Sequence, residues 1–148
     1  MIIDPKMVRK PWGLEEWLCD GQRMPYALKR ITFHAGHRSS LQVHHNKKET
    51  NLVLSGTGQL EIGRRPFPID AYLLGTMDDN GLQWYMEDCH IHELTPGMVF
   101  DVTPCTIHRI TAMTDLVFIE ASTPELDDVI RLHDDTGRAN GRIASEHG

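Results

Sequence analysis

The stretch that decides the fold is AGHRSSLQVHHNKKETNLVLSG, which runs from residue 35 to residue 56. Side chains alternate between the two faces of a strand, so Gln42 and His44 project together while His45 projects to the opposite face. Glu49 returns to the shared face when the chain turns after the histidine pair and enters the next strand. A carbonyl oxygen, an imidazole and a carboxylate then converge, and a borderline divalent ion accepts all three as ligands.

A fourth ligand is expected from the segment TPCTIHR at residues 103–109, where a proline turn leads into a strand. Its histidine, His108, comes opposite Gln42 and His44 when the two strands pair. The sequence therefore predicts one divalent metal ion, held by Gln42, His44, Glu49 and His108, with positions left open to a substrate. Zn²⁺ is favoured, and Mn²⁺, Fe²⁺, Ni²⁺ and Co²⁺ are alternatives.

Outside this stretch the chain is a series of short segments rich in β-branched and aromatic residues, separated by Gly, Pro, Asp or Asn. This pattern predicts an all-β sandwich or barrel. Residues 122–130 fit either a capped helix or a terminal strand. The polar residues that follow, roughly the last dozen, are expected to be mobile. The expected strands are residues 26–33, 40–45, 52–54, 59–62, 98–102, 107–112 and 116–120.

Length and composition narrow the class of protein. The 148 residues, of which 40% are hydrophobic and 24% charged, predict one soluble domain over residues 1–148. Apolar runs such as residues 116–119 are far shorter than the ~20 residues of a membrane helix, and the N-terminus lacks a secretory pattern. We therefore expect no membrane partner and a cytoplasmic location. A net charge of −6 without a basic stripe argues against nucleic acid as a partner.

Two motifs in these segments resemble those of the cupin superfamily. The first, G-x5-H-x-H-x4-E-x6-G, is matched in spacing throughout, with Gln42 in the place of the first histidine. The second, G-x5-P-x-G-x2-H-x3-N, keeps His108 but has Thr103 for Pro, Cys105 for Gly and Ala112 for Asn. This resemblance implies a cupin jelly-roll barrel with the metal in its interior cavity.

A narrower resemblance is to the cupin domain of type II phosphomannose isomerases, a module often fused to mannose-1-phosphate guanylyltransferase. The segments KPWG at 10–13, LKRIT at 28–32 and SLQVHH at 40–45 are similar to that family's R-P-W-G, V-K-R-I-T and S-L-Q-M-H-H. LDDVIR at 126–131 resembles its E-D-D-I-V-R. The chain departs from the family at residues 63–93, because this segment is longer than the corresponding segment of the family.

The narrower resemblance also implies roles for individual residues. Ser40 and Lys29 approach the substrate, and Arg138 is the arginine that the isomerases need, so catalysis falls to Arg138 and Lys29. Arg30 and Lys47 join Ser40 as substrate-binding residues, because a phosphate dianion needs several charge-assisted donors. The expected activity is metal-dependent aldose–ketose isomerisation of a small sugar phosphate, foremost mannose 6-phosphate to fructose 6-phosphate, by a homodimer.

Two other functions stay open at this point. The same barrel with a redox metal can activate oxygen as a dioxygenase. Departures from the family pattern, at Thr103, Cys105, Ala112 and Thr136, fit a non-enzymatic cupin that only binds a sugar.

The remaining histidines and tryptophans have simpler interpretations. His45 is expected to face outward or to support the ligands. Residues 89–93, CHIHE, place two histidines on one strand face, and we interpret them as a solvated strand rather than a second metal site. Trp12, Trp17 and Trp84 are expected to close the ends of the barrel.

Overall fold

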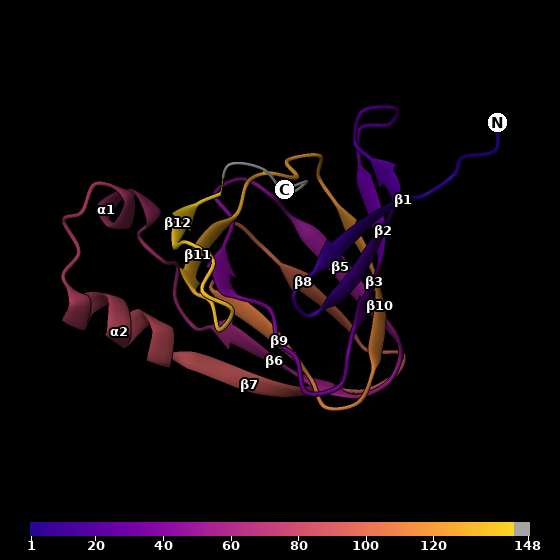
Figure 1. The fold of residues 1–148 in the computed structure, drawn as a ribbon. Helices are drawn as coiled ribbons and strands as arrows, with labels where there is room; N and C mark the ends of the chain where they lie inside the picture. The colour runs from indigo at the N-terminus through magenta and orange to yellow at the C-terminus, as the bar shows by residue number, and fades with distance from the viewer. Residues whose placement is uncertain (144–148) are drawn as a thin grey trace.

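The computed structural model describes residues 1–143, which form two six-stranded antiparallel sheets and two short helices (Figure 1). The all-β jelly-roll prediction is confirmed. In order across the first sheet the strands are β1 (Lys6–Lys10), β2 (Gly13–Asp20), β3 (Ala27–Phe33), β10 (Leu116–Ser122), β5 (Glu49–Ser55) and β8 (Val99–Val102). Across the second sheet they are β12 (Gly141–Arg142), β11 (Ile130–His133), β4 (Leu41–Val43), β9 (His108–Ala112), β6 (Gly58–Gly63) and β7 (Cys89–Leu94).

Alternation along β3 separates a buried inner face from a more exposed outer face. On β3 the odd-numbered residues from 27 to 33 are buried, and Arg30 between them is exposed. At one end of the interior, Trp12 stacks on Phe33 with ring centres 3.9 Å apart, and Phe33 also contacts Phe118. Each large apolar side chain buried in this way stabilises the fold by roughly 1.5–3 kcal/mol. Trp12 is therefore part of the apolar core and also lines the cavity described below.

Strands β1 and β2 are not among the segments that the sequence predicted. The burial of β2 alternates regularly, with Gly13, Glu15, Trp17 and Cys19 on the inner face. A charged residue, Glu15, occupies one of these inner positions, so the hydrophobic alternation that marks a half-buried strand is broken. The strand forms because Glu15 has buried partners, which are described below.

Residues 63–93 add two helices, α1 (Ile69–Leu73) and α2 (Asp79–Glu87), which lie outside the barrel (Figure 1). Their side chains and the preceding Phe67 pack with residues on the outer face of the second sheet, among them Leu41, Val43, Ile107, Ile130 and Leu132. Trp84 on α2 is half exposed, so it does not close a barrel end. Within residues 1–143, no helix is long and apolar enough to span a membrane.

The segment between β10 and β11 forms turns, so residues 123–129 are neither the expected helix nor the expected terminal strand. Pro124 to Val129 make short turns in which Leu126 and Val129 are buried, and β11 then pairs with β4. Strand β12 pairs with β11 and gives the tail a defined path as far as residue 143. The rest of the expected mobile tail, residues 144–148, lies outside the described residues.

Candidate metal centre and cavity

Three of the predicted metal ligands converge between the two sheets. His44 follows β4, Glu49 begins β5 and His108 begins β9, and all three side chains are almost fully buried. Glu49 Oε1 lies 3.8 Å from His44 Nε2 and 3.7 Å from His108 Nε2. The potential ligand atoms all lie within 4.8 Å of one another, close enough for one ion to contact each. Among residues 1–143, no other group of three or more His, Cys, Asp and Glu side chains lies close enough together to hold a metal ion.

Backbone carbonyls orient both imidazole rings toward this point. His44 Nδ1 donates to the carbonyl of Asp128 at 2.6 Å, and His108 Nδ1 donates to that of Thr106 at 3.0 Å. A proton on Nδ1 leaves the lone pair on Nε2, the tautomer that a metal ligand requires. His44 Nε2 is buried and has no hydrogen-bond partner among the described residues. The donor set therefore fits a divalent ion.

Burial keeps His108 neutral. Burial, together with the nearby His44, lowers the pKa of His108 to about 4 against the opposing charge of Glu49. Burial alone would raise the pKa of Glu49, but the Lys47 ammonium, 3.3 Å from Glu49 Oε2, together with the neighbouring Glu120 and His44, outweighs burial and holds that pKa well below its ordinary value. A neutral imidazole and an ionised carboxylate are the forms that bind a metal.

Gln42, the fourth predicted ligand, lies directly across the sheet from His108. Its amide nitrogen is 3.4 Å from His108 Nε2, and its oxygen accepts a hydrogen bond from Ser40 Oγ at 2.8 Å. A half-turn about the Cγ–Cδ bond would present the oxygen to the metal group instead. The structure thus places Gln42 beside the other three ligands, with its nitrogen toward them.

Lys29 and Lys47 are internal counter-ions rather than the expected catalytic and substrate-binding groups. Lys29 Nζ lies 3.1 Å from Glu15 Oε1 and 4.5 Å from the centre of the Trp17 ring. Lys47 Nζ lies 3.5 Å from Glu120 Oε2. Both lysine side chains are at most 5% exposed, and neither lines the cavity described below. Alternation on β3 points Lys29 inward to Glu15, and the turn before β5 brings Lys47 to Glu49, so each ammonium balances a carboxylate.

Glu120 and Glu15, which lie beside these lysines, have pKa values that shift in opposite directions. Burial and the adjacent Glu49 carboxylate together raise the pKa of Glu120 to about 8, against the opposing charge of Lys47. Burial would also raise the pKa of Glu15, but the charge of Lys29 and other donors outweigh it and lower that pKa.

Arg30 and Ser40 also lie elsewhere than expected. Arg30 is on the outer face of β3, where its half-exposed guanidinium pairs with Glu16 at 2.6 Å, so it does not reach the barrel interior. The Ser40 side chain is buried and orients Gln42. Its neighbour Ser39 lines the cavity instead.

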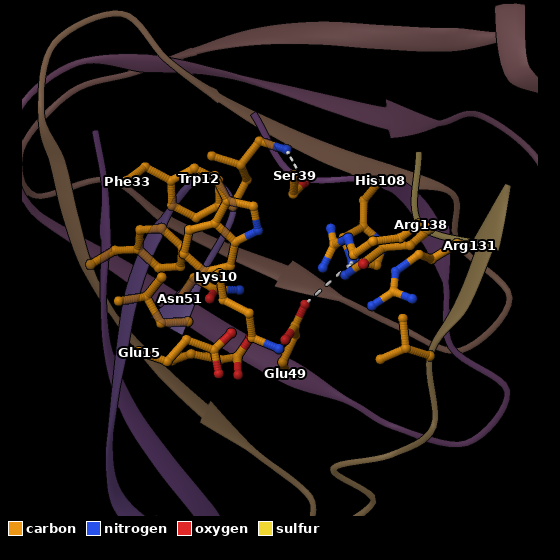
Figure 2. Close-up of a pocket in the computed structure, with 16 residues that line it drawn as sticks. Lys10, Trp12, Glu15, Phe33, Ser39, Glu49, Asn51, His108, Arg131 and Arg138 are labelled. Atoms are coloured by element: carbon orange, nitrogen blue, oxygen red, sulfur yellow. Dashed lines mark hydrogen bonds and ion pairs between the residues drawn. The ribbon is translucent and has the colours of Figure 1, made fainter. Parts of the chain in front are cut away.

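A cavity of about 70 Å³ adjoins the metal group (Figure 2). One part of its wall is apolar, with Trp12, Ile31, Phe33, Ile110, Phe118 and Val129. The polar part consists of Lys10, Glu15, Ser39, Gln42, Glu49, Asn51, His108, Glu120, Arg131 and Arg138. His44 contacts this wall through Glu49 and His108 without lining the cavity. This combination suits a small polar molecule with an apolar edge.

Arg131 and Arg138 lie together at one side of the cavity (Figure 2). Arg131 is paired with Gln42 across β11 and β4. Arg138 is held by Asp134, with Nη2 3.0 Å from Oδ1, and its side chain is 25% exposed. This ion pair outweighs burial and holds the pKa of Asp134 far below its ordinary value. Arg138 therefore reaches the cavity.

Sequence reasoning missed Asp128, which builds the turn between the ligands. Its carboxylate accepts hydrogen bonds from the backbone N–H groups of His45, Asn46 and Lys47 at 3.1, 2.6 and 2.9 Å. Burial would raise the pKa of Asp128, but these hydrogen bonds outweigh it and lower that pKa. The Asp128 carbonyl also accepts the hydrogen bond from His44. Asp128 therefore fixes both the orientation of the His44 ring and the conformation of the turn that follows it.

Cys105 explains how the second motif tolerates its departure from glycine. Its backbone has φ of 63°, the left-handed region that favours glycine, at the position where the cupin motif has one. The turn geometry of the motif is therefore kept without its usual residue.

His45, His90 and His92 lie outside the metal group. His45 is exposed and points away from the metal group. His90 and His92 lie exposed on β7, at an edge of the second sheet, with ring centres 5.9 Å apart. They have no third ligand among the described residues, which agrees with a solvated strand.

The two-sheet barrel with a His, Glu and His group inside it is that of a cupin. The capsular polysaccharide assembling protein CapF of Staphylococcus aureus matches with a TM-score of 0.63 and 18% identity, over 88% of this chain and 34% of that chain. Oxalate decarboxylase of Bacillus subtilis, a protein with Mn(II) centres, matches with a TM-score of 0.61 and 16% identity, over 86% of this chain and 30% of that chain. At these identities the likeness concerns the fold alone.

The profile described as mannose-6-phosphate isomerase C-terminal matches residues 4–134, and the chain belongs to this family. Its curated relatives include the mannose-1-phosphate guanylyltransferase ManC of Salmonella typhimurium, 30% identical over 132 residues, which are 88% of this chain and 23% of the relative. The chain spans less than a quarter of the length of the curated relatives it matches.

Proposed function

We propose that this chain is a metal-dependent aldose–ketose isomerase for a phosphorylated sugar, with mannose 6-phosphate to fructose 6-phosphate as the leading reaction. One observation carries the proposal: a group fitted to a metal ion adjoins the same small cavity that a pair of arginines lines. An isomerase of this kind needs a positive charge at the reacting oxygens and an anion site for the phosphate. Membership of the family supports the choice of substrate.

The metal would be held by His44, Glu49 and His108, with Gln42 as the fourth ligand after its amide turns. Mixed nitrogen and oxygen ligands favour Zn²⁺, and Mn²⁺, Fe²⁺, Ni²⁺ and Co²⁺ suit the same set. When bound, the ion supplies positive charge beside the oxygen on which negative charge develops.

The cavity is large enough for only a part of a sugar phosphate. A volume of about 70 Å³ has room for roughly five water molecules, which is less than a whole sugar phosphate requires. The reacting carbons therefore enter the cavity, and the phosphate stays with Arg131 and the partly exposed Arg138. Guanidinium groups suit this role because they bind phosphate oxygens in pairs.

The isomerisation needs no outside oxidant. The C2–H bond breaks, C1 gains a proton, and the O2 hydroxyl proton moves to O1. Outside the metal group, Glu15 and Glu120 are the carboxyl groups in the cavity wall, and we assign the carbon-to-carbon proton transfer to one of them.

Elemental analysis followed by NMR of hexose phosphates in D₂O tests this proposal. We expect one divalent ion per chain, deuterium at C1 or C2, and loss of both metal and turnover in His44→Ala and His108→Ala. The exposed His90→Ala is the matched control and should keep both. Metal retained in both ligand variants would exclude the site.

The same preparation separates the other functions. Oxygen consumption with bound Fe²⁺ would identify a dioxygenase, and thermal protection by sugar phosphates without turnover would identify a binding protein. Light scattering tests the proposed homodimer.

A further inference from the structure

Asn51 lies in the cavity wall on the same strand as the metal ligand Glu49. The two residues are separated by one position on β5, so both side chains point into the barrel. Asn51 is only 1% exposed. Figure 2 shows it on the side of Glu15 and Glu49, away from Arg131 and Arg138.

The Asn51 carboxamide has no hydrogen-bond partner within residues 1–143. Neither Oδ1 nor Nδ2 makes a hydrogen bond, although the side chain is buried. Its neighbours across the sheet are Glu120 on β10 and Phe100 on β8. A buried amide without partners destabilises a fold, and native structures rarely leave both of its polar atoms unpaired. The next inward position on the strand, Val53, is apolar and avoids this cost.

The chemistry of the carboxamide indicates what would pair with it. An amide donates and accepts hydrogen bonds at the same time, and so does a hydroxyl group. It carries no charge, so it does not compete with the arginines for a phosphate. One residue in between separates Asn51 from Glu49 by about 7 Å along the strand. The group that it binds is therefore further along the substrate than the oxygens beside the metal.

We propose that Asn51 is a specificity residue that binds a sugar hydroxyl at C3 or C4 and so selects polyhydroxylated substrates carrying it. The inference rests on the proposed function for the numbering of the sugar carbons. The unpaired amide in the cavity wall supports a hydroxyl ligand independently of the reaction.

Calorimetric titration of the metal-loaded protein with mannose 6-phosphate and its 3-deoxy and 4-deoxy analogues tests the inference. Wild type should bind one deoxy analogue about 10-fold to 100-fold more weakly than the parent sugar. Asn51→Leu should lose a similar factor for the parent and no longer distinguish the analogues. Asn51→Thr is a second, strand-compatible variant, and Asn80→Leu on the exposed surface of α2 is the matched control.

Each outcome decides between the two proposals. Turnover of mannose 6-phosphate with equal binding of all three sugars would overturn the role of Asn51 alone. Discrimination without turnover would support Asn51 and refute the isomerase. Loss of bound metal in both Asn51 variants would make the residue a ligand and overturn the inference, and absence of sugar binding would overturn both proposals.

Discussion

Replacement of Lys29 by methionine tests whether this lysine is a counter-ion or a catalytic group. Lys29 Nζ lies 3.1 Å from Glu15, and both side chains are at most 5% exposed. At an effective dielectric constant of about 20, unit charges at this distance attract by roughly 5 kcal/mol. Removing one partner of a buried pair typically costs about 3–5 kcal/mol, because the other charge stays behind. We expect Lys29→Met to lose an amount in this range.

The loss should depend on pH in a defined direction. In wild type the pKa of Glu15 is lowered, so the pair stabilises the fold above the ordinary carboxyl pKa of about 4.5 and this contribution is lost as the pH falls through the lowered value. Without the ammonium, burial raises the pKa of Glu15, and folding must then take up a proton. The penalty in Lys29→Met should therefore grow by up to about 1.4 kcal/mol per pH unit above 4.5.

Urea unfolding followed by circular dichroism at pH 5 and pH 8 measures both quantities. Arg30→Met, one residue along on the outer face, is the control and should change stability by less than about 1 kcal/mol. The double variant Lys29→Met with Glu15→Leu should recover most of the loss. A stable Lys29→Met that has lost turnover, or a loss that does not change with pH, would refute the counter-ion assignment.

Three further substitutions examine the turn, the motif and the anion site. Asp128→Ala should lower the free energy of unfolding by about 2–4 kcal/mol and weaken metal binding, because three backbone N–H groups lose their acceptor; unchanged values in urea unfolding and metal titration would contradict this role. Cys105→Gly should raise the unfolding free energy by up to ~1 kcal/mol, since left-handed backbone favours glycine; a lower urea midpoint would show that the side-chain contacts outweigh the strain. Arg138→Ala should raise KM for the sugar phosphate by about 10-fold or more at unchanged metal content, whereas Arg30→Ala should leave KM unaltered; equal KM values in steady-state assays would remove Arg138 from the site.

The metal group could be predicted because its geometry follows from local rules. Alternation separates His44 from His45, and the turn that returns Glu49 to the same face is only a few residues long. The pairing of Gln42 with His108 is a long-range contact, but the second motif marks the histidine by its position after a proline turn. Ligand positions of this kind depend on strand register more than on the rest of the barrel.

The roles of the charged residues could not be predicted in the same way. Alternation shows that Lys29 faces inward, but it does not show that Glu15 reaches it from another strand or that Lys47, in the turn before β5, folds onto Glu49. The sequence therefore presents these cations as free to bind phosphate, while in the structure they are neutralised internally. Asn51 carries no sequence signal at all, because a single polar residue in a strand is ordinary until its surroundings are known.

The position of β10 also affects how the chain folds. This strand is hydrogen-bonded to β3 on one side and to β5 on the other, so Glu120 stands between Lys29 and Asn51. Without β10 the first sheet is two separate pieces, and Glu120 is missing from the charged residues on its inner face. Contacts between segments so distant in sequence slow the search for the native state. We therefore expect the binding site to form late in folding, as one cooperative step with the closure of the barrel.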